Sequence, residues 1–129
     1  MNLTDNEKAI RKLMNKTKKS MKELDIYKPQ FDTSIKRYAE TLHIYNLQLD
    51  EFYQNGCKIT EEYTNKAGAT NERKTPLFLS LEKLRSDILA LENVLGLNPQ
   101  SFARLNKDKK DHTKEMSALE KVLMKVDLD

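Results

Sequence analysis

Two stretches of the chain carry apolar residues at the alternating spacing of four and three that is typical of packed helices. The members of the first stretch are Phe31, Ile35, Tyr38, Leu42, Tyr45, Leu49 and Phe52. The members of the second are Leu77, Leu81, Leu84, Ile88, Leu91 and Leu95. Such a heptad seam faces one partner helix. The pattern predicts a mainly α fold built on a helical hairpin of two long helices.

Residues with special backbone preferences mark the ends of both predicted helices. Pro29 fits the first turn of one helix, and Asn55-Gly56 supplies its C-terminal signal. Thr75-Pro76 combines a capping side chain with a proline at the first turn of the other helix. Gly96 can take the left-handed conformation that closes that helix. The boundaries therefore agree with the two seams.

The segment between the two helices loses the helical period. Ile59 and Tyr63 alternate with polar neighbours, and the turn-prone residues 65–68 follow. Alternation of this kind beside a turn is typical of two paired strands. Residues 57–75 are therefore predicted to form a short β-hairpin or an ordered loop.

A further helix is predicted before the hairpin of long helices. Thr4 with Glu7 three residues later has the spacing of a capping box. The apolar residues that then recur at helical spacing are Ile10, Leu13, Met14, Met21 and Leu24. We expect a flanking helix from about Asp5 to Leu24.

The C-terminal third begins with a helical corner. Asn98 is placed to cap a short helix from Pro99 to about Asn106, which would carry Phe102 and Leu105 toward a core. Residues 107–111 alternate in charge and are predicted to be a solvated linker. The last apolar positions at helical spacing are Met116, Leu119, Leu123 and Val126. They predict a short amphipathic helix that needs a partner, because about four turns are marginally stable alone.

The second long helix has more apolar residues than one partner helix would cover. The residues off its seam are Phe78, Leu79, Leu89, Val94 and Leu97. Burying one such side chain is worth about 1.5–3 kcal/mol, so other copies of the chain are expected to cover this surface. The seam residues that we expect at the subunit interface are Tyr38, Leu42, Tyr45, Leu81, Leu84, Ile88 and Leu91.

Positive charge is concentrated at the N-terminus. Residues 1–28 contain eight Lys and Arg against four Asp and Glu, an excess of 8 − 4 = +4, whereas the whole chain carries +3. Cations along a helix bind phosphates, so this helix is a candidate DNA-binding element. The candidate DNA-binding residues are Lys8, Arg11, Lys12, Lys16, Lys18, Lys19 and Lys22. The alternative is an ordinary solvated surface.

Composition narrows the class of protein. A chain of 129 residues, 33% charged and 38% hydrophobic, is long enough for one domain. The single Cys57 and the absence of a long apolar run favour the cytoplasm over a membrane or secreted location. His43 and His112 lack neighbours at metal-ligand spacing, and no phosphate-binding glycine loop occurs. We therefore expect a protein that is not an enzyme and uses no metal or cofactor.

Residues 95–105, with the sequence LGLNPQSFARL, resemble the end of the conserved region in phage terminase small subunits. In that family a long helix runs into LGL, a small polar residue, Pro and a short segment ending in Arg and Leu. The resemblance extends back to about Tyr27. Phe102 departs from it, because the family often has a basic residue at this place.

The resemblance implies a ring of identical subunits that recognises double-stranded viral DNA in the bacterial host cytoplasm. It further implies that the ring regulates the large terminase subunit, which supplies the ATPase and nuclease. On this basis we expect a basic N-terminal helix in residues 1–28, a helical core and oligomerisation region in residues 29–106, and a linker and C-terminal helix in residues 107–129. The latter is the candidate contact for the large subunit. The alternatives are a coiled-coil scaffold and a small dimeric DNA-binding regulator.

Overall fold

The computed structural model describes residues 3–128, which form a mainly α fold. The helices are α1 (Leu3–Glu23), α2 (Asp32–Gln54), α3 (Pro76–Leu95) and α4 (Pro99–Leu128), with a 3-10 turn η1 (Pro29–Phe31) before α2. Two strands, β1 (Thr60–Thr64) and β2 (Thr70–Lys74), lie between α2 and α3. The predicted hairpin of long helices, its flanking helices and the β-hairpin are thereby confirmed.

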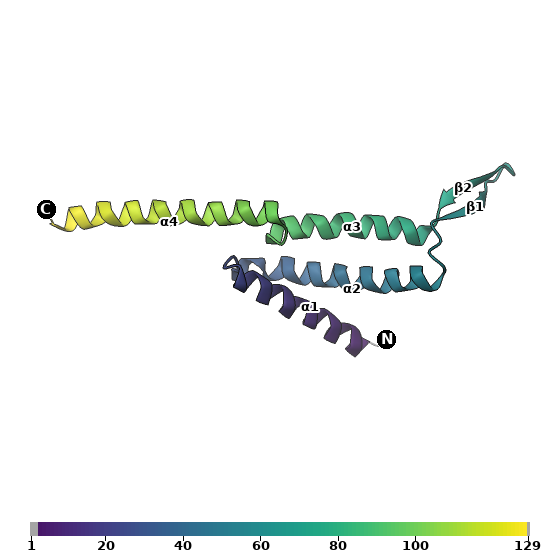
Figure 1. The fold of residues 1–129 in the computed structure, drawn as a ribbon, viewed down its shortest axis with the longest axis horizontal. Helices are drawn as coiled ribbons and strands as arrows, with labels where there is room; N and C mark the ends of the chain where they lie inside the picture. The colour runs from purple at the N-terminus through teal and green to yellow at the C-terminus, as the bar shows by residue number, and fades with distance from the viewer. Residues whose placement is uncertain (1–2, 129) are drawn as a thin grey trace.

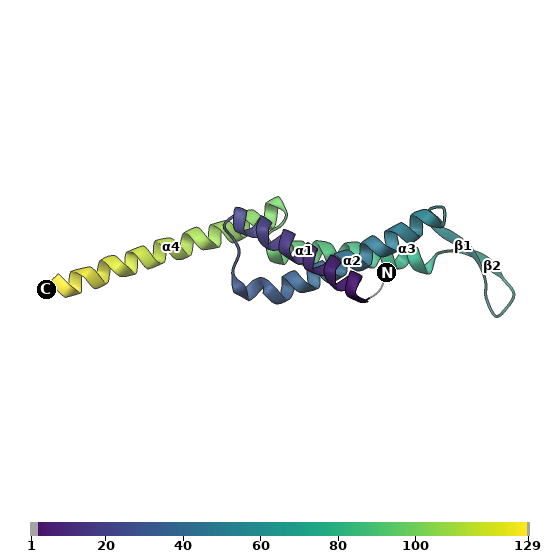
Figure 2. The same cartoon turned by 90° about the horizontal axis from the view of Figure 1, so that it is seen from below.

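The molecule is elongated, with its packed part in the middle (Figure 1). Helices α2 and α3 lie antiparallel, and α1 packs on α2. The β-hairpin extends beyond one end of this three-helix body, and α4 extends alone beyond the other (Figures 1 and 2). The fold therefore presents two projecting arms on opposite ends of a small helical body.

The core lies where α1, α2 and the end of α3 meet. Its buried residues are Met21, Ile26, Ile35, Tyr38 and Leu95. The partly buried residues packed against them are Met14, Tyr27, Phe31, Leu42, Ile88, Leu91, Leu97, Phe102 and Leu105. The two heptad seams thus pack within one chain, and the predicted burial of Phe102 and Leu105 at the corner is confirmed.

Side-chain caps and left-handed residues close the helices where the sequence predicts them. The Thr75 hydroxyl accepts a hydrogen bond from the Phe78 amide at 3.1 Å. Gly96 ends α3 with φ 71°, and its amide donates to the Glu92 carbonyl. The Asn98 side chain then accepts from the Ser101 amide at 2.9 Å and caps α4. These contacts satisfy amides that a helix end leaves without partners.

The β-hairpin is held mainly by its own ladder and turn. Strands β1 and β2 are antiparallel, with Thr60 opposite Lys74 and Thr64 opposite Thr70. The Asn65 side chain accepts hydrogen bonds from the amides of Ala67 and Ala69, both at 3.0 Å. Nearly all of its residues are exposed. An isolated two-stranded hairpin is marginally stable in water, so this arm depends on its own hydrogen bonds and on contacts at its base, such as the ion pair of Lys74 with Glu82 on α3.

Helix α4 contradicts two predictions. Residues 107–111 are not a linker and the C-terminal helix is not short, because one helix of 30 residues runs from Pro99 to Leu128. No glycine or proline interrupts the chain after Pro99, so the alternating charges continue the helix on its solvent side.

At the other end of the chain, the predicted capping box of Thr4 and Glu7 is wrong in detail, since α1 begins at Leu3 and already includes Thr4.

Candidate nucleic-acid interface

Helix α1 is fixed on α2 by one side of its surface. Met21 is fully buried, and the buried Thr17 hydroxyl donates to the Leu13 carbonyl at 2.8 Å. Nearer the N-terminus, the Asn6 side-chain oxygen lies 2.8 Å from Nε2 of His43 on α2. His43 is 7% exposed, so this hydrogen bond is part of the packed interface. The burial of Met21 and Thr17, together with the contact of Asn6 with His43, determines which side of α1 faces outward.

The outward side of α1 carries the predicted DNA-binding residues. At about 100° per residue, the seven cations fall within an arc of about 160°, which is centred on the side away from Asn6, Thr17 and Met21. Of these, Lys8, Arg11, Lys12, Lys16, Lys19 and Lys22 are exposed and Lys18 is half-buried. The structure therefore brings the seven together on one accessible face.

Two of the seven cations have partners at the junction between α1 and α2. Lys18 Nζ lies 3.6 Å from a carboxylate oxygen of Asp32. Lys22 Nζ lies 5.2 Å from the centre of the Tyr27 ring, a cation–π contact. The Tyr27 hydroxyl donates to Asp32 at 2.7 Å, and this hydrogen bond raises the pKa of Tyr27. Among residues 3–128, the other five cations form no ion pair.

A shallow depression accompanies this basic face near the end of α1. It has a volume of about 450 Å³ and is lined by Asn15, Lys18, Lys19, Lys22 and Glu23. Three cations against one acid make it suitable for an anion such as a phosphate group. Lysine acts there as a point charge, which fixes position on a nucleic acid without reading its sequence.

The predicted interface residues of the seams lie largely inside the single chain. Tyr38 and Leu81 are 8% and 1% exposed, and Tyr45 accepts a hydrogen bond from Arg85 Nε across α2 and α3 at 3.0 Å. The half-buried members are Leu42, Tyr45, Leu84, Ile88 and Leu91. Packing within the chain thus already covers much of this set, because each seam faces the other.

A different apolar surface is left open. Leu79, Leu89 and Val94 on α3 are 52%, 55% and 46% exposed, as their positions off the seam predict. Sequence reasoning missed Ile44 and Leu47 on α2, which are 46% and 43% exposed. The same test, apolar residues away from the heptad positions, would have found them.

The corner between α3 and α4 is a structural joint. Arg104 donates from Nη2 to the Asn93 carbonyl at 2.8 Å, so its guanidinium group is engaged at the end of α3. Phe102, which replaces a basic residue of the family pattern, packs against the core. Phe102 offers no charge for a phosphate group, and one donor of Arg104 is already used within the chain.

Two features are absent from the part of the chain that the structure describes. Between residues 3 and 128, no three His, Cys, Asp or Glu side chains come together in a way that could hold a metal ion. No helix in the same range is long and apolar enough to cross a membrane.

Comparison with known proteins agrees with the resemblance at the corner. The profile of the family described as "Phage terminase, small subunit" matches residues 11–112, most of the chain. Neither curated proteins nor solved structures give a match. The matched range includes the end of α1 with its cations, the hairpin of α2 and α3, and the first half of α4. This chain therefore belongs to the family of phage terminase small subunits.

Proposed function

We propose that this protein recognises viral DNA during genome packaging and regulates the large terminase subunit, with α1 as a DNA-binding element. The observation that carries the proposal is the row of unpaired cations on the outward face of α1. A helix needs such a face for phosphate binding, whereas ion pairs with neighbouring acids would neutralise it. Family membership supports a role in packaging, and the charge of α1 supports contact with the nucleic acid.

Charge reversal on α1 tests the DNA-binding role. We expect the triple variant Lys12→Glu, Lys16→Glu, Lys19→Glu to bind duplex DNA more weakly. Each lost phosphate contact lowers the slope of log affinity against log salt by about 0.9, so loss of three contacts lowers it by about 2.7. The matched control is Lys36→Glu, Lys58→Glu, Lys66→Glu, which changes net charge equally at exposed positions elsewhere. Equal DNA binding by the triple variant and the wild type would contradict the assignment.

Assembly into a ring of copies is the second part of the proposal. The open apolar residues of α2 and α3 support it, because each of five large side chains stays 43–55% exposed in the single chain. These residues are Ile44, Leu47, Leu79, Leu89 and Val94. The seam residues that are half-buried, such as Leu84, would add to the contact at its edges. A cyclic oligomer by native mass spectrometry supports the ring, whereas a dimer favours the regulator alternative.

The C-terminal half of α4 is the candidate contact for the large subunit. Met116, Leu119 and Leu123 lie at helical spacing and are 45–55% exposed. No side chain of residues 114–125 forms a hydrogen bond or ion pair with another described element. An apolar seam on a free helix suits a groove or helix of a partner protein.

A further inference from the structure

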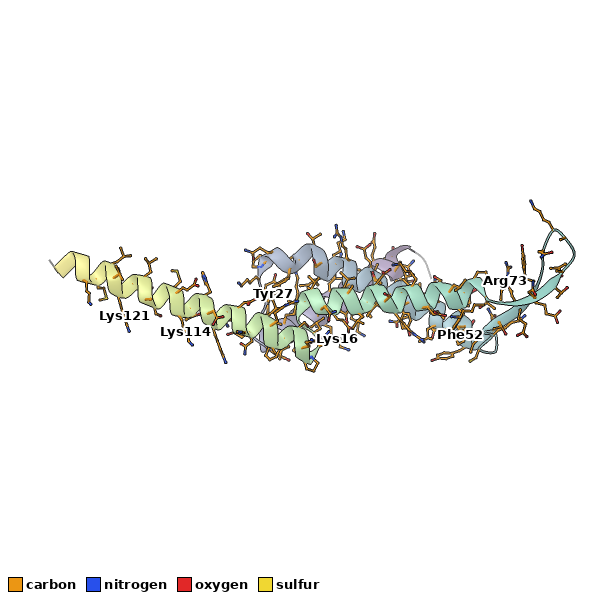
Figure 3. The ribbon with its side chains drawn as sticks, turned by 90° about the horizontal axis from the view of Figure 1, so that it is seen from above. Lys16, Tyr27, Phe52, Arg73, Lys114 and Lys121 are labelled. Carbon is orange, nitrogen blue, oxygen red and sulfur yellow. The ribbon has the colours of Figure 1, made fainter. Side chains whose placement is uncertain are left out.

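Helix α4 carries a second row of cations that the assignment of α1 does not use. Its members are Lys107, Lys110, Lys114, Lys121 and Lys125. At about 100° per residue these five positions fall within an arc of about 60°. All five side chains are exposed. Figure 3 shows Lys114 and Lys121 projecting from the same side of α4.

The row brings like charges close together, and their repulsion destabilises the helix when nothing is bound to it. Lys110 with Lys114, and Lys121 with Lys125, are like-charge pairs at a spacing of four. Each such pair destabilises a helix by about 0.2–0.5 kcal/mol. Within residues 3–128, none of the five lysines forms an ion pair, although Asp111 follows Lys107 by four residues. A bound polyanion would remove this repulsion.

The lysine row lies on the opposite side of α4 from the apolar seam. Leu105, Met116, Leu119 and Leu123 centre about 180° away from it, counted at 100° per residue. A partner helix on the seam would therefore leave the lysines facing solvent. Lys109, which is outside the row, pairs with Asp25 and joins the first turns of α4 to the body. This ion pair helps to fix where the row is presented.

We propose that the lysine row of α4 binds the phosphate backbone of duplex DNA as a contact separate from α1. The choice of DNA as the polyanion rests on the proposed function of this protein. With a rise of 1.5 Å per residue, the row is about 27 Å long and has a gap of about 10 Å between Lys114 and Lys121. That gap is close to the width of the major groove, about 12 Å. Its two groups of lysines thereby reach phosphates on both edges of one groove.

Neutralising the row in the full-length chain tests this site. The variant Lys110→Gln, Lys114→Gln, Lys121→Gln removes three charges while keeping good helix formers. We measure binding to a random-sequence duplex at several salt concentrations. Each phosphate contact contributes about 0.9 to the slope of log affinity against log salt, so loss of three contacts should lower this slope by about 2.7. The matched control Lys36→Gln, Lys58→Gln, Lys66→Gln loses the same charge at other exposed positions and should bind like wild type.

Three outcomes decide between the alternatives. If the α4 variant binds DNA with unchanged affinity and slope while the α1 reversal weakens binding, the second site is wrong and the proposed function stands. If neither variant changes DNA binding, the assignments of α1 and of the lysine row of α4 are both wrong. Retained DNA binding together with lost binding to phosphatidylserine vesicles would assign the row to a lipid surface and overturn the proposal. Should the triple variant assemble abnormally by native mass, Lys107→Gln with Lys125→Gln should still lower the slope by about 1.8.

Discussion

Tyr38 on α2 donates a hydrogen bond from its hydroxyl to Glu92 on α3 at 3.1 Å, across 54 residues of sequence. Tyr38 is 8% exposed and belongs to the core, so its phenol places a polar group inside the helical hairpin. Buried polar groups of this kind need a partner, and Glu92 is the one present. This hydrogen bond therefore links α2 to α3 and favours one alignment of the two heptad seams.

Replacing Tyr38 with Phe should lower the free energy of unfolding by about 0.5–1.5 kcal/mol, because the variant removes one hydrogen bond and keeps the ring. Urea unfolding followed by circular dichroism measures the change. Tyr53→Phe is the matched control, since Tyr53 is 59% exposed and should change stability by less than about 0.5 kcal/mol. Equal stability of the Tyr38 variant and wild type would show that the bond contributes nothing.

The pair of Tyr38 and Glu92 also predicts that the free energy of unfolding falls as the pH rises into the alkaline range. Burial, and then the charge and hydrogen bond of Glu92, raise the pKa of Tyr38 well above its ordinary value. The folded state thus holds this proton more tightly than the unfolded state, whose tyrosine titrates near pH 10. The stabilisation is complete below about pH 10 and is lost as pH rises through the folded pKa. Wild type should therefore lose more stability than Tyr38→Phe between about pH 9 and pH 11, measured by urea unfolding.

Gly96→Ala should destabilise the joint between α3 and α4 more than a glycine replacement elsewhere. At φ 71°, a Cβ would lie 2.6 Å from Leu105 Cδ1 and 2.9 Å from Ile26 Cδ1. Gly56→Ala is the control, because Gly56 has φ 81° at the end of α2 and open space around it. The left-handed backbone destabilises both variants by about 1–2 kcal/mol, and the clash destabilises Gly96→Ala further. Equal melting temperatures for the two variants would contradict close packing at this corner.

A charge on the open face of α3 should disrupt assembly. Leu89 is 55% exposed in the single chain, so Leu89→Glu leaves the fold intact but buries a carboxylate in any contact between copies. We expect native mass spectrometry to show smaller species than for wild type. Ala67→Glu at the exposed tip of the β-hairpin is the control and should assemble normally. If Leu89→Glu forms the same oligomer, this face is not the subunit interface.

Polar substitutions in the α4 seam should separate regulation from DNA binding. Leu119→Gln with Leu123→Gln removes about 1.5 kcal/mol or more of apolar burial per site, which is about tenfold in affinity for each. Stimulation of the ATPase of the large subunit should fall, while the DNA binding proposed for the lysines should be retained. Val122→Gln with Met124→Gln changes equally exposed residues off the seam and should leave stimulation intact. Full stimulation by the seam variant would assign this helix another role.

Local sequence patterns determined the elements of the body. The alternation of four and three in the two seams requires a helical period, and Thr75, Gly96 and Asn98 act within a few residues of their own positions. Short-range physics of this kind is readable from a single sequence. The resemblance in residues 95–105 also identified the family, which the match over residues 11–112 confirmed.

Tertiary structure decided which apolar residues remain exposed. From sequence, Tyr38 and Leu81 were predicted at the subunit interface, yet α2 and α3 of the same chain bury them, because each seam has an intramolecular partner close by. The continuity of α4 was missed for a related reason. Alternating charges fit a solvated linker or the exposed side of a helix equally well, and here the chain runs straight on from a capped start at Asn98. The sequence thus determined the helices and their ends, whereas packing in space decided which surfaces are left for other molecules.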